Sequence, residues 1–344
     1  MLPNISFLIP VYNVQSFLDD CLASVVTACA NTDQIILIND GSTDESGSVC
    51  DKWAARYPDL IQVVHQPNQG LSVARNVAYA HCHGDYVCFI DSDDVLCSEA
   101  IAVARQHLRE RQPDILTMDA ILWRSGEHDE PLRHSLPALQ TVSAQHALIA
   151  AFRDNFMSSC CRIFRRSLLE SMAPQIFPPG RCYEDNITVP LLIAKASTIM
   201  YVPHALFRYR VRPGSITRHQ TFSRCMDQAT SLASPLRAIK MLNESQELEQ
   251  QANVAVLSNV VIAIRHAGAI PRVSRADLEA LLAAGLSSLT MNTPALLAAA
   301  QQADTRHAKL SKHARGMLLH PKRYVLARWL MARWKQMRQP TLRT

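Results

Sequence analysis

The first 120 residues alternate short β-branched, apolar runs with longer segments of helical pattern, and this alternation limits the possible folds more than any other feature. The expected strands are Ile5–Val11, Gln34–Asn39, Ile61–His65, Tyr86–Ile90 and Ile115–Met118. The expected helices are Ser16–Cys29, a helix capped by Thr43 that runs to about Tyr57, Ser72–Ala80 and Ser98–Arg111. Strand and helix alternate about every 25 to 30 residues, which predicts an α/β fold: a parallel sheet with right-handed crossovers and helices on both faces.

The rest of the chain is less regular. A polar, proline-containing stretch follows residue 120, and residues 221–304 read as helices rich in Ala, Leu, Gln and Glu. We therefore expect a first domain over 1–220, with halves 1–120 and 121–220, then a helical region over 221–304 and a basic tail over 305–344.

The tail differs in charge from the rest of the chain. Residues 305–344 hold eleven of the 35 Lys and Arg residues and none of the 30 Asp and Glu, so residues 1–304 have 24 basic against 30 acidic residues, or −6. An apolar side flanked by basic residues recurs at helical spacing, formed by Leu326, Trp329, Leu330, Arg333 and Trp334. Residues 306–338 are expected to lie on an anionic membrane surface. The alternative is a helix that docks on the body with its charges solvated.

Composition excludes several classes of protein. With 48% hydrophobic and 19% charged residues, the chain has the composition of a soluble globular protein. No apolar run reaches the roughly 18 residues of a membrane span, and Met1–Phe7 lacks the basic start of a secretory signal. The ten cysteines form no C-x-x-C pair, which favours buried thiols over disulfides or zinc. We expect a cytoplasmic protein, peripheral on the inner face of the membrane, and the oligomeric state is not indicated.

Three carboxylates follow the fourth expected strand. Asp91, Asp93 and Asp94 come directly after a buried run, and desolvated like charges need a counter-charge. A hard divalent cation, Mg²⁺ or Mn²⁺, satisfies one or two such carboxylates and completes its shell with water and substrate phosphates. The alternative is an Asx turn that caps the helix at Ser98.

The ends of the first two strands carry residues suited to a nucleoside. Asp40 remains at the sheet edge after the second strand and can accept hydrogen bonds from a base or ribose, unless it is simply a turn aspartate. The first strand ends in Pro10-Val-Tyr12-Asn13, where the Tyr12 ring can pack on a base and Asn13 can cap the next helix.

Two further segments offer cations. Gly70 allows a tight entry to the third helix, whose first turns carry Arg75, a partner for the carboxylates or for a phosphate. Arg212 and Ser215 belong to a segment of arginines and hydroxyls around a glycine, suited to gripping phosphate oxygens. Structural ion pairing for Arg75 and a basic surface loop around Arg212 are the alternatives.

A second acidic site begins a later helix. Glu184 and Asp185 precede an apolar helical pattern, and acidic residues at a helix start commonly cap it. A metal-assisted transfer, however, needs one group for the leaving phosphate and another that removes a proton from the acceptor.

These motifs occur in a characteristic order: Ile9-Pro-Val-Tyr-Asn13, Asn39-Asp-Gly-Ser-Thr-Asp44, Asn68-x-Gly-Leu-Ser-x-Ala-Arg-Asn76, Phe89-Ile-Asp-Ser-Asp-Asp94, Tyr183-Glu-Asp185 and Tyr209-Arg-x-Arg-x-Gly-Ser-Ile216. The series resembles inverting family 2 glycosyltransferases with the GT-A fold, bacterial enzymes that build lipopolysaccharide, capsule and other surface glycans. The resemblance covers about residues 3–217.

The resemblance implies a hexosyltransferase that moves a sugar from a UDP-sugar to a glycan or lipid-linked acceptor. It implies that Asp40 reads uracil beside Tyr12, that Asp91 contacts the ribose or sugar, and that Asp93 is the metal ligand of the D-x-D motif, with Asp91 as the second expected metal ligand. Asp185 resembles the general base, and Glu184 is the less favoured base. The remaining residues expected at the nucleotide-sugar are Pro10, Asn13, Gly70, Arg75, Ser92, Arg212 and Ser215.

Other functions fit the sequence less well. A sugar-phosphate nucleotidyltransferase needs an early glycine-rich loop with a lysine, but the first lysine is Lys52. A nucleic-acid-binding protein is opposed by the acidic charge of residues 1–304, so we expect no nucleic acid partner. A protein that binds the nucleotide without catalysis remains an alternative.

Overall fold

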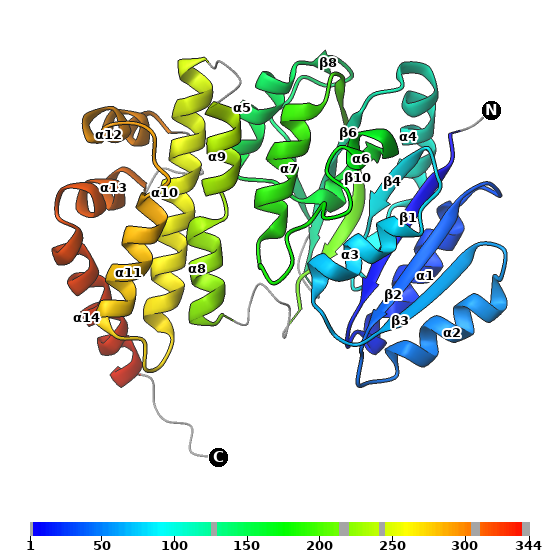
Figure 1. Cartoon of the computed structure of the whole chain (residues 1–344), viewed down its shortest axis with the longest axis horizontal. Coiled ribbons are helices and arrows are strands. Elements are labelled where there is room, and N and C mark those ends of the chain that lie inside the picture. Colours follow the sequence, from blue (N-terminus) through cyan, green and yellow to red (C-terminus); the bar gives the residue numbers. More distant parts are fainter. Residues whose placement is uncertain (1–2, 125–128, 213–219, 241–244, 304–309, 339–344) are drawn as a thin grey trace. The chain divides into compact units, whose positions relative to one another are not determined.

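The computed structural model describes residues 3–124, 129–212, 220–240, 245–303 and 310–338. Its contacts divide the chain into two compact units (Figure 1). The first comprises Met1–Ala150, Met157–Gly180 and Thr188–Arg212, and the second comprises Ala151–Phe156, Arg181–Ile187 and Pro213–Thr344.

The amino-terminal part of the first unit alternates strands with helices, as the sequence predicts. Its elements are β1 (Ile5–Val11), α1 (Gln15–Ala28), β2 (Gln34–Asp40), α2 (Ser46–Arg56), β3 (Ile61–Gln66), α3 (Leu71–Ala80), β4 (Tyr86–Phe89), β5 (Val95–Leu96), α4 (Ser98–Arg111) and β6 (Ile115–Trp123). Further elements follow: β7 (Glu130–Leu132), β8 (Thr141–Val142), α5 (Ala144–Asp154), a 3-10 turn (Ser159–Cys161), β9 (Arg162–Arg165), α6 (Arg166–Glu170), α7 (Glu184–Lys195) and β10 (Ile199–Arg210).

The sheet is mixed rather than wholly parallel. Its order is β3-β2-β1-β4-β9-β6-β10-β5, with β7 beside β6 and β8 beside β10. Strands β1 to β4 are parallel, and so are β6 and β10, whereas β9 runs antiparallel between β4 and β6 and β5 runs antiparallel to β10. The sequence did not predict β9 or β5 because runs of four and two residues show no periodicity.

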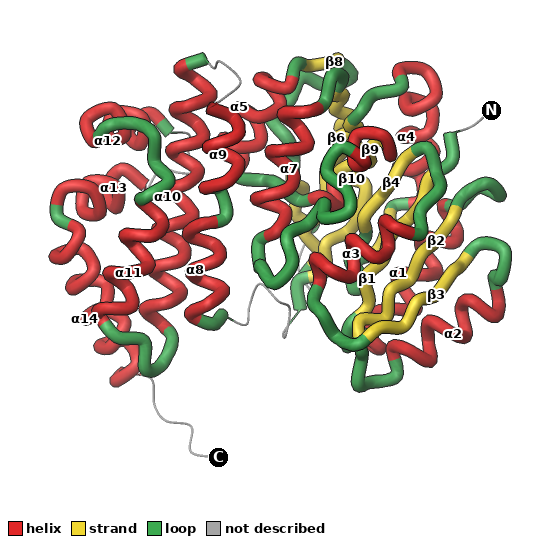
Figure 2. The backbone as a smooth tube through the Cα atoms, viewed as in Figure 1, coloured by secondary structure: helices red, strands yellow, loops and turns green. Residues whose placement is uncertain are grey.

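Helices cover both faces of the parallel strands, as expected. The steps from β1 to β2 and from β2 to β3 move the same way across the sheet, so right-handed crossovers place α1 and α2 on one face. The step from β3 to β4 reverses direction and places α3 on the other face, against β1 and β2 (Figure 2). Every residue of β1 and β2 is buried, which is typical of strands covered on both sides.

Two predicted helix caps are wrong. Helix α2 begins at Ser46, and Thr43 lies outside it, because the Asp44 carboxylate accepts the backbone N–H of Ser46 at 3.0 Å. Asn13 precedes the N-cap of α1 with a φ of +50°, and its Oδ1 accepts the backbone N–H of Thr43 at 2.8 Å. The side chain of Asn13 therefore joins two loops instead of capping a helix.

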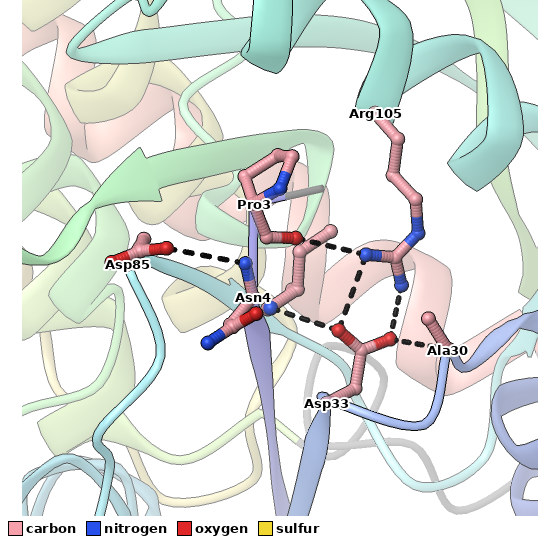
Figure 3. A network of polar contacts seen from close by, with 7 residues as sticks. Pro3, Asn4, Ala30, Asp33, Asp85 and Arg105 are labelled. Atoms are coloured by element: carbon pink, nitrogen blue, oxygen red, sulfur yellow. Dashed lines mark hydrogen bonds and ion pairs between the residues drawn. The ribbon is translucent and has the colours of Figure 1, made fainter. Parts of the chain in front are cut away.

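A buried ion pair fastens the amino ends of β1 and β2 (Figure 3). The guanidinium of Arg105, on α4, donates both to the Asp33 carboxylate and to the Pro3 carbonyl. The same carboxylate accepts the backbone N–H groups of Ile5, at 2.9 Å, and Ala30, at 2.7 Å. The Asp33 side chain is fully buried, and each of its oxygens has partners.

The second unit is helical where it is described. Its helices are α8 (Phe222–Thr230), α9 (Ala233–Lys240), α10 (Gln246–Ala269), α11 (Arg275–Leu286), α12 (Thr293–Gln302), α13 (Leu310–Leu319) and α14 (Pro321–Arg338). Helix α10 contacts all the others in this unit and, contrary to the sequence expectation, is long and apolar enough to cross a membrane. However, 67% of its apolar window is buried within the protein, as in the core helix of a soluble protein.

Helix α14 separates residues that the sequence grouped on one side. Trp329 Nε1 donates to the Val273 carbonyl at 3.4 Å, and the Arg333 guanidinium donates to the same carbonyl. Leu326, Leu330 and Trp334, in contrast, are exposed. Part of the predicted apolar side therefore bonds to the protein through Trp329 and Arg333, and the rest of it is exposed.

Candidate active site

The predicted nucleotide-binding residues follow the carboxyl ends of parallel strands. Asp40 is the last residue of β2, Tyr12 follows β1, and Asp91 lies two residues after β4. The register pairs Val11 with Asn39, so the ends of β1 and β2 are level. The fold thus gathers these side chains at the edge where α/β sheets bind ligands.

Asp40 is buried and fixes the turn that leads into α3. Its Oδ1 accepts Gln66 Nε2 at 2.7 Å and the Gln69 N–H at 2.9 Å, and its Oδ2 accepts the Gly70 N–H at 2.8 Å. Gly70 has a φ of +87°, which a residue without Cβ adopts at little cost. Asp40 therefore has the role of a turn aspartate that we gave as the alternative. Its Oδ2 accepts only one of these three hydrogen bonds and has two lone pairs, so it can accept another.

The end of β1 presents an aromatic ring to solvent. The Tyr12 side chain is 48% exposed, although the strand before it, including Pro10, is buried. Asn13 holds this segment to the loop after β2, since its N–H donates to Ser42 Oγ at 3.2 Å. An exposed ring beside strand ends can stack on a nucleobase.

A buried arginine holds Asp91. Arg75, on α3, is 1% exposed, and its Nη2 donates to Asp91 Oδ1 at 2.9 Å. The guanidinium lies 5.1 Å from the ring centroid of Phe177, and Nη2 is 3.8 Å from Cys160 Sγ. The ion pair expected as the alternative role of Arg75 is therefore present, and it orients the Asp91 carboxylate.

Asp93 and Asp94 are held by the end of β10. Arg212 Nε donates to Asp93 Oδ2 at 2.7 Å, Arg210 Nε donates to the Asp93 carbonyl at 2.8 Å, and the Arg210 N–H donates to Asp94 Oδ1 at 2.8 Å. The antiparallel pairing of β5 with β10 brings these segments together. Ser92, between the carboxylates, is buried, and Ser215 lies outside the described residues.

The cluster is electrostatically crowded. Burial raises the pKa of Asp93, and the neighbouring Asp91 raises it further, while Arg212 opposes the rise. Burial also raises the pKa of Asp94 well above its ordinary value, with Asp91 and Asp93 adding to the effect. The arginines therefore do not fully compensate the charge of these carboxylates.

The sequence interpretation missed the aromatic residues that position the arginines. The Arg210 guanidinium lies 4.2 Å from the ring centroid of Trp123 and 5.1 Å from that of Phe17, and the Arg212 guanidinium lies 4.9 Å from the Phe17 ring. Arg210 also donates to Asp20 at 3.0 Å. Trp123, Phe17 and Asp20 are far from the two arginines in the sequence, so no local pattern predicts these contacts. Arg210 itself lies in one of the motifs that carry the family resemblance.

The second acidic pair lies in the second unit. Glu184 and Asp185 occupy the first turn of α7, where the helix dipole favours negative charge. Residues on either side of the pair bond to α8 and to its C-cap. The Cys182 N–H donates to Asp227 Oδ2 at 3.1 Å, and Asn186 Nδ2 donates to Ser231 Oγ at 3.1 Å. Glu184 is buried and Asp185 is partly exposed.

The donor set at Asp91 and Asp93 fits a hard divalent cation. In the described part of the chain, no group of three or more His, Cys, Asp or Glu side chains is arranged to hold a metal ion. Mg²⁺ and Mn²⁺ bind one or two carboxylates together with water and substrate phosphates, so two suffice. Asp94 Oδ2 is also buried without a hydrogen-bond partner among the described residues. The carboxylates fit a cation that binds with a phosphorylated substrate.

Comparison with known proteins agrees with this arrangement. Residues 6–172 match the model of glycosyl transferase family 2. The glycosyltransferase GlyA of Streptococcus pneumoniae is 27% identical over 62% of this chain and 31% of its own, so the chain spans about a third of GlyA's length. The minor teichoic acid biosynthesis protein GgaB of Bacillus subtilis is 26% identical over 63% of this chain and 24% of its own.

A solved structure shares the fold. The crystal structure of an S. aureus TarS fragment in complex with UDP-GlcNAc superposes with a TM-score of 0.67 at 18% identity, covering 97% of this chain and 91% of that one. The predicted GT-A fold, an α/β sheet flanked by helices and followed by a helical region, is confirmed. The chain therefore carries a glycosyltransferase domain of family 2, a family of transferases.

Proposed function

We propose that the protein is an inverting glycosyltransferase that moves a sugar from a UDP-sugar to a hydroxyl of a glycan or lipid-linked acceptor in bacterial surface-polysaccharide synthesis. The observation that carries the proposal is the pair Asp91 and Asp93 at the end of β4, each oriented by an arginine. The names of the relatives support the polysaccharide context, and the UDP-GlcNAc complex of TarS supports a UDP-sugar.

In this proposal the strand ends bind the donor. Tyr12 stacks on uracil, and Asp40 accepts a uracil N–H through Oδ2 while its other bonds keep the carboxylate in place. Asp91, fixed by Arg75, accepts from ribose or sugar hydroxyls. Arg212 and Ser215 bind the diphosphate, which competes with Asp93 for the Arg212 guanidinium.

Asp93 and Asp91 would hold a divalent cation, which would supply positive charge to the departing diphosphate. Before the substrate binds, Arg75 orients the Asp91 carboxylate and Arg212 orients the Asp93 carboxylate. Burial, and then the neighbouring Asp91, raise the pKa of Asp93, and this supports a site that gains from added positive charge.

Asp185 acts as the general base and removes the proton from the acceptor hydroxyl that attacks the anomeric carbon. The attack comes from the face opposite the leaving diphosphate, so one displacement inverts the anomeric centre and an α-linked UDP-sugar gives a β-glycoside. In this proposal the enzyme works in the cytoplasm at the inner face of the membrane, beside a lipid-linked acceptor.

The test is release of UDP from a panel of UDP-sugars, with Mn²⁺ and with EDTA. Turnover of one donor that needs the metal and is lost in Asp93→Asn supports the proposal. Asp185→Asn is expected to lower the rate about 10²-fold to 10⁴-fold. Asp59→Asn, at an exposed carboxylate, is the matched control and should behave like the wild type. Turnover of GDP- or dTDP-sugars alone would contradict the role of Asp40.

A further inference from the structure

Helix α14 has an inner face that explains its place in the second unit. Val325 is completely buried, and Trp329 and Arg333 both donate to the Val273 carbonyl. The helix contacts α10, α11 and α13. These contacts account for the docking of α14 in the second unit.

The opposite arc is apolar and exposed. Leu326 is 36% exposed, Leu330 52%, Met331 51% and Trp334 49%. Positions 326, 330 and 334 are four residues apart, so their side chains form one row along the helix, with Met331 beside it. We call these four residues the outer stripe.

The exposed large apolar side chains are concentrated around the outer stripe and are not spread evenly over the described surface. Seven large hydrophobic side chains are exposed in the described part of the chain, and five of them lie between Leu319 and Trp334. Single exposed apolar residues need no explanation, but a contiguous group marks a surface that binds something.

Basic side chains border the outer stripe. Lys322 lies four residues before Leu326 and extends the row by one helical turn, whereas Lys335 lies four residues after Met331, on the flank of the stripe that borders α10. Arg323 is also exposed on this side. The segment 305–344 has no acidic residue to offset these charges. The combination of an apolar row, a tryptophan and uncompensated lysines is complementary to an anionic lipid headgroup layer.

We propose that the outer stripe of α14 is a peripheral binding surface for anionic bilayers, in which Leu326, Leu330 and Trp334 insert below the headgroups. Lys322, Arg323 and Lys335 then contact lipid phosphates near the surface. This assignment is narrower than the sequence prediction, because Trp329 and Arg333 are partly buried and bond to Val273.

The test is flotation of the full chain with vesicles of neutral phosphatidylcholine and with vesicles that also contain phosphatidylglycerol. We expect binding to the anionic vesicles that weakens as salt is added. Leu330→Ser with Trp334→Ser should reduce the bound fraction about tenfold or more, since both residues lose buried apolar area in the bilayer. Lys322→Gln with Lys335→Gln should reduce binding to anionic vesicles alone.

A matched control removes an exposed apolar side chain elsewhere. Leu139, in the first unit, is 55% exposed, so Leu139→Ser should bind vesicles like the wild type. Equal thermal melting of all variants shows that they fold, which is expected because the changed side chains are exposed. Binding is measured without donor or metal, so its outcome is independent of glycosyl transfer.

Three results would overturn the proposal. The first is no binding to anionic vesicles at low salt, and the second is equal binding of the wild type and the Leu330→Ser, Trp334→Ser variant. The third is a wild-type oligomer in sedimentation velocity that this variant dissociates, which would assign the outer stripe to contact between two copies of the chain.

Discussion

The two ends of the sheet in the first unit both hold carboxylates against arginine, and they differ in how completely the charges are matched. At the amino end, the Asp33 carboxylate has Arg105 and two backbone N–H groups, which occupy both of its oxygens (Figure 3). At the carboxyl end, Asp93 has Arg212, but two more carboxylates are close enough to interact with it.

This difference separates a structural ion pair from a binding site. The amino-end pair is fully hydrogen-bonded, the condition under which a buried pair is tolerated in a folded protein. At the carboxyl end, burial and like charge raise the pKa of Asp93 and Asp94, so this end gains from a ligand that brings positive charge. Both ends use aspartate and arginine, and they differ in how fully hydrogen bonds and opposite charges satisfy the carboxylates.

The largest expected effect comes from removing one charge at the carboxyl end. Asp93→Asn should lower the rate of sugar transfer by at least about 10³-fold, since the proposed cation at the leaving diphosphate loses a ligand. Without metal the variant should be no less stable than the wild type, because the loss of the Arg212 ion pair is offset by relief of repulsion. Steady-state UDP release and thermal melting in EDTA measure the two quantities, and a large loss of stability would contradict the comparison.

The same substitution at the amino end should have the opposite outcome. Asp33→Asn leaves Arg105 buried without its charge partner and should destabilise the protein by about 3 kcal/mol or more, with activity per folded molecule unchanged. Urea unfolding combined with activity at low temperature measures this. Glu279→Gln, which breaks the exposed pair with Arg275, is the matched control and should cost less than about 0.5 kcal/mol.

Metal should stabilise one end of the sheet and not the other. Mn²⁺ at about a hundred times its dissociation constant should raise the free energy of unfolding by about 2.7 kcal/mol in the wild type and in Asp33→Asn. Asp93→Asn should show no such gain. Differential scanning calorimetry with Mn²⁺ and with EDTA measures the effect, and an equal gain in all three proteins would place the metal elsewhere.

The smallest expected effect is a dependence of stability on pH. Because the pKa of Asp94 is raised in the folded protein, folding favours its protonated form, and the free energy of unfolding in EDTA should fall as the pH rises from its ordinary pKa through its folded pKa. Asp94→Asn should flatten that fall, while its amide oxygen still accepts the Arg210 N–H. Asp59→Asn should leave the curve unchanged.

The sequence predicts the parts of the first unit that depend on local pattern. Strands β1, β2 and β4 are buried, mainly apolar runs followed by polar residues, so both their positions and the clustering of Asp40 and Asp91 at one edge follow from sequence pattern and topology. Arg75 was expected near the acidic cluster, and the structure supplies the bond to Asp91.

Other features depend on contacts between distant segments and leave no local signal. The approach of Arg212 to Asp93 requires the pairing of β5 with β10, which a two-residue strand does not reveal. The division of α14 into an inner and an outer face likewise depends on Val273, more than fifty residues away in the chain. The network around Asp33 uses backbone groups that no side-chain pattern encodes.

The most direct test of the carboxyl-end site is calorimetric titration of UDP into the wild type, Asp93→Asn and Asp33→Asn, each with Mn²⁺ and with EDTA. We predict tight binding that requires Mn²⁺ in the wild type and in folded Asp33→Asn, and loss of the metal-dependent part in Asp93→Asn. Equal binding of UDP with Mn²⁺ and with EDTA, unchanged in Asp93→Asn, would contradict the assignment of a metal-assisted nucleotide-sugar site to the end of β4.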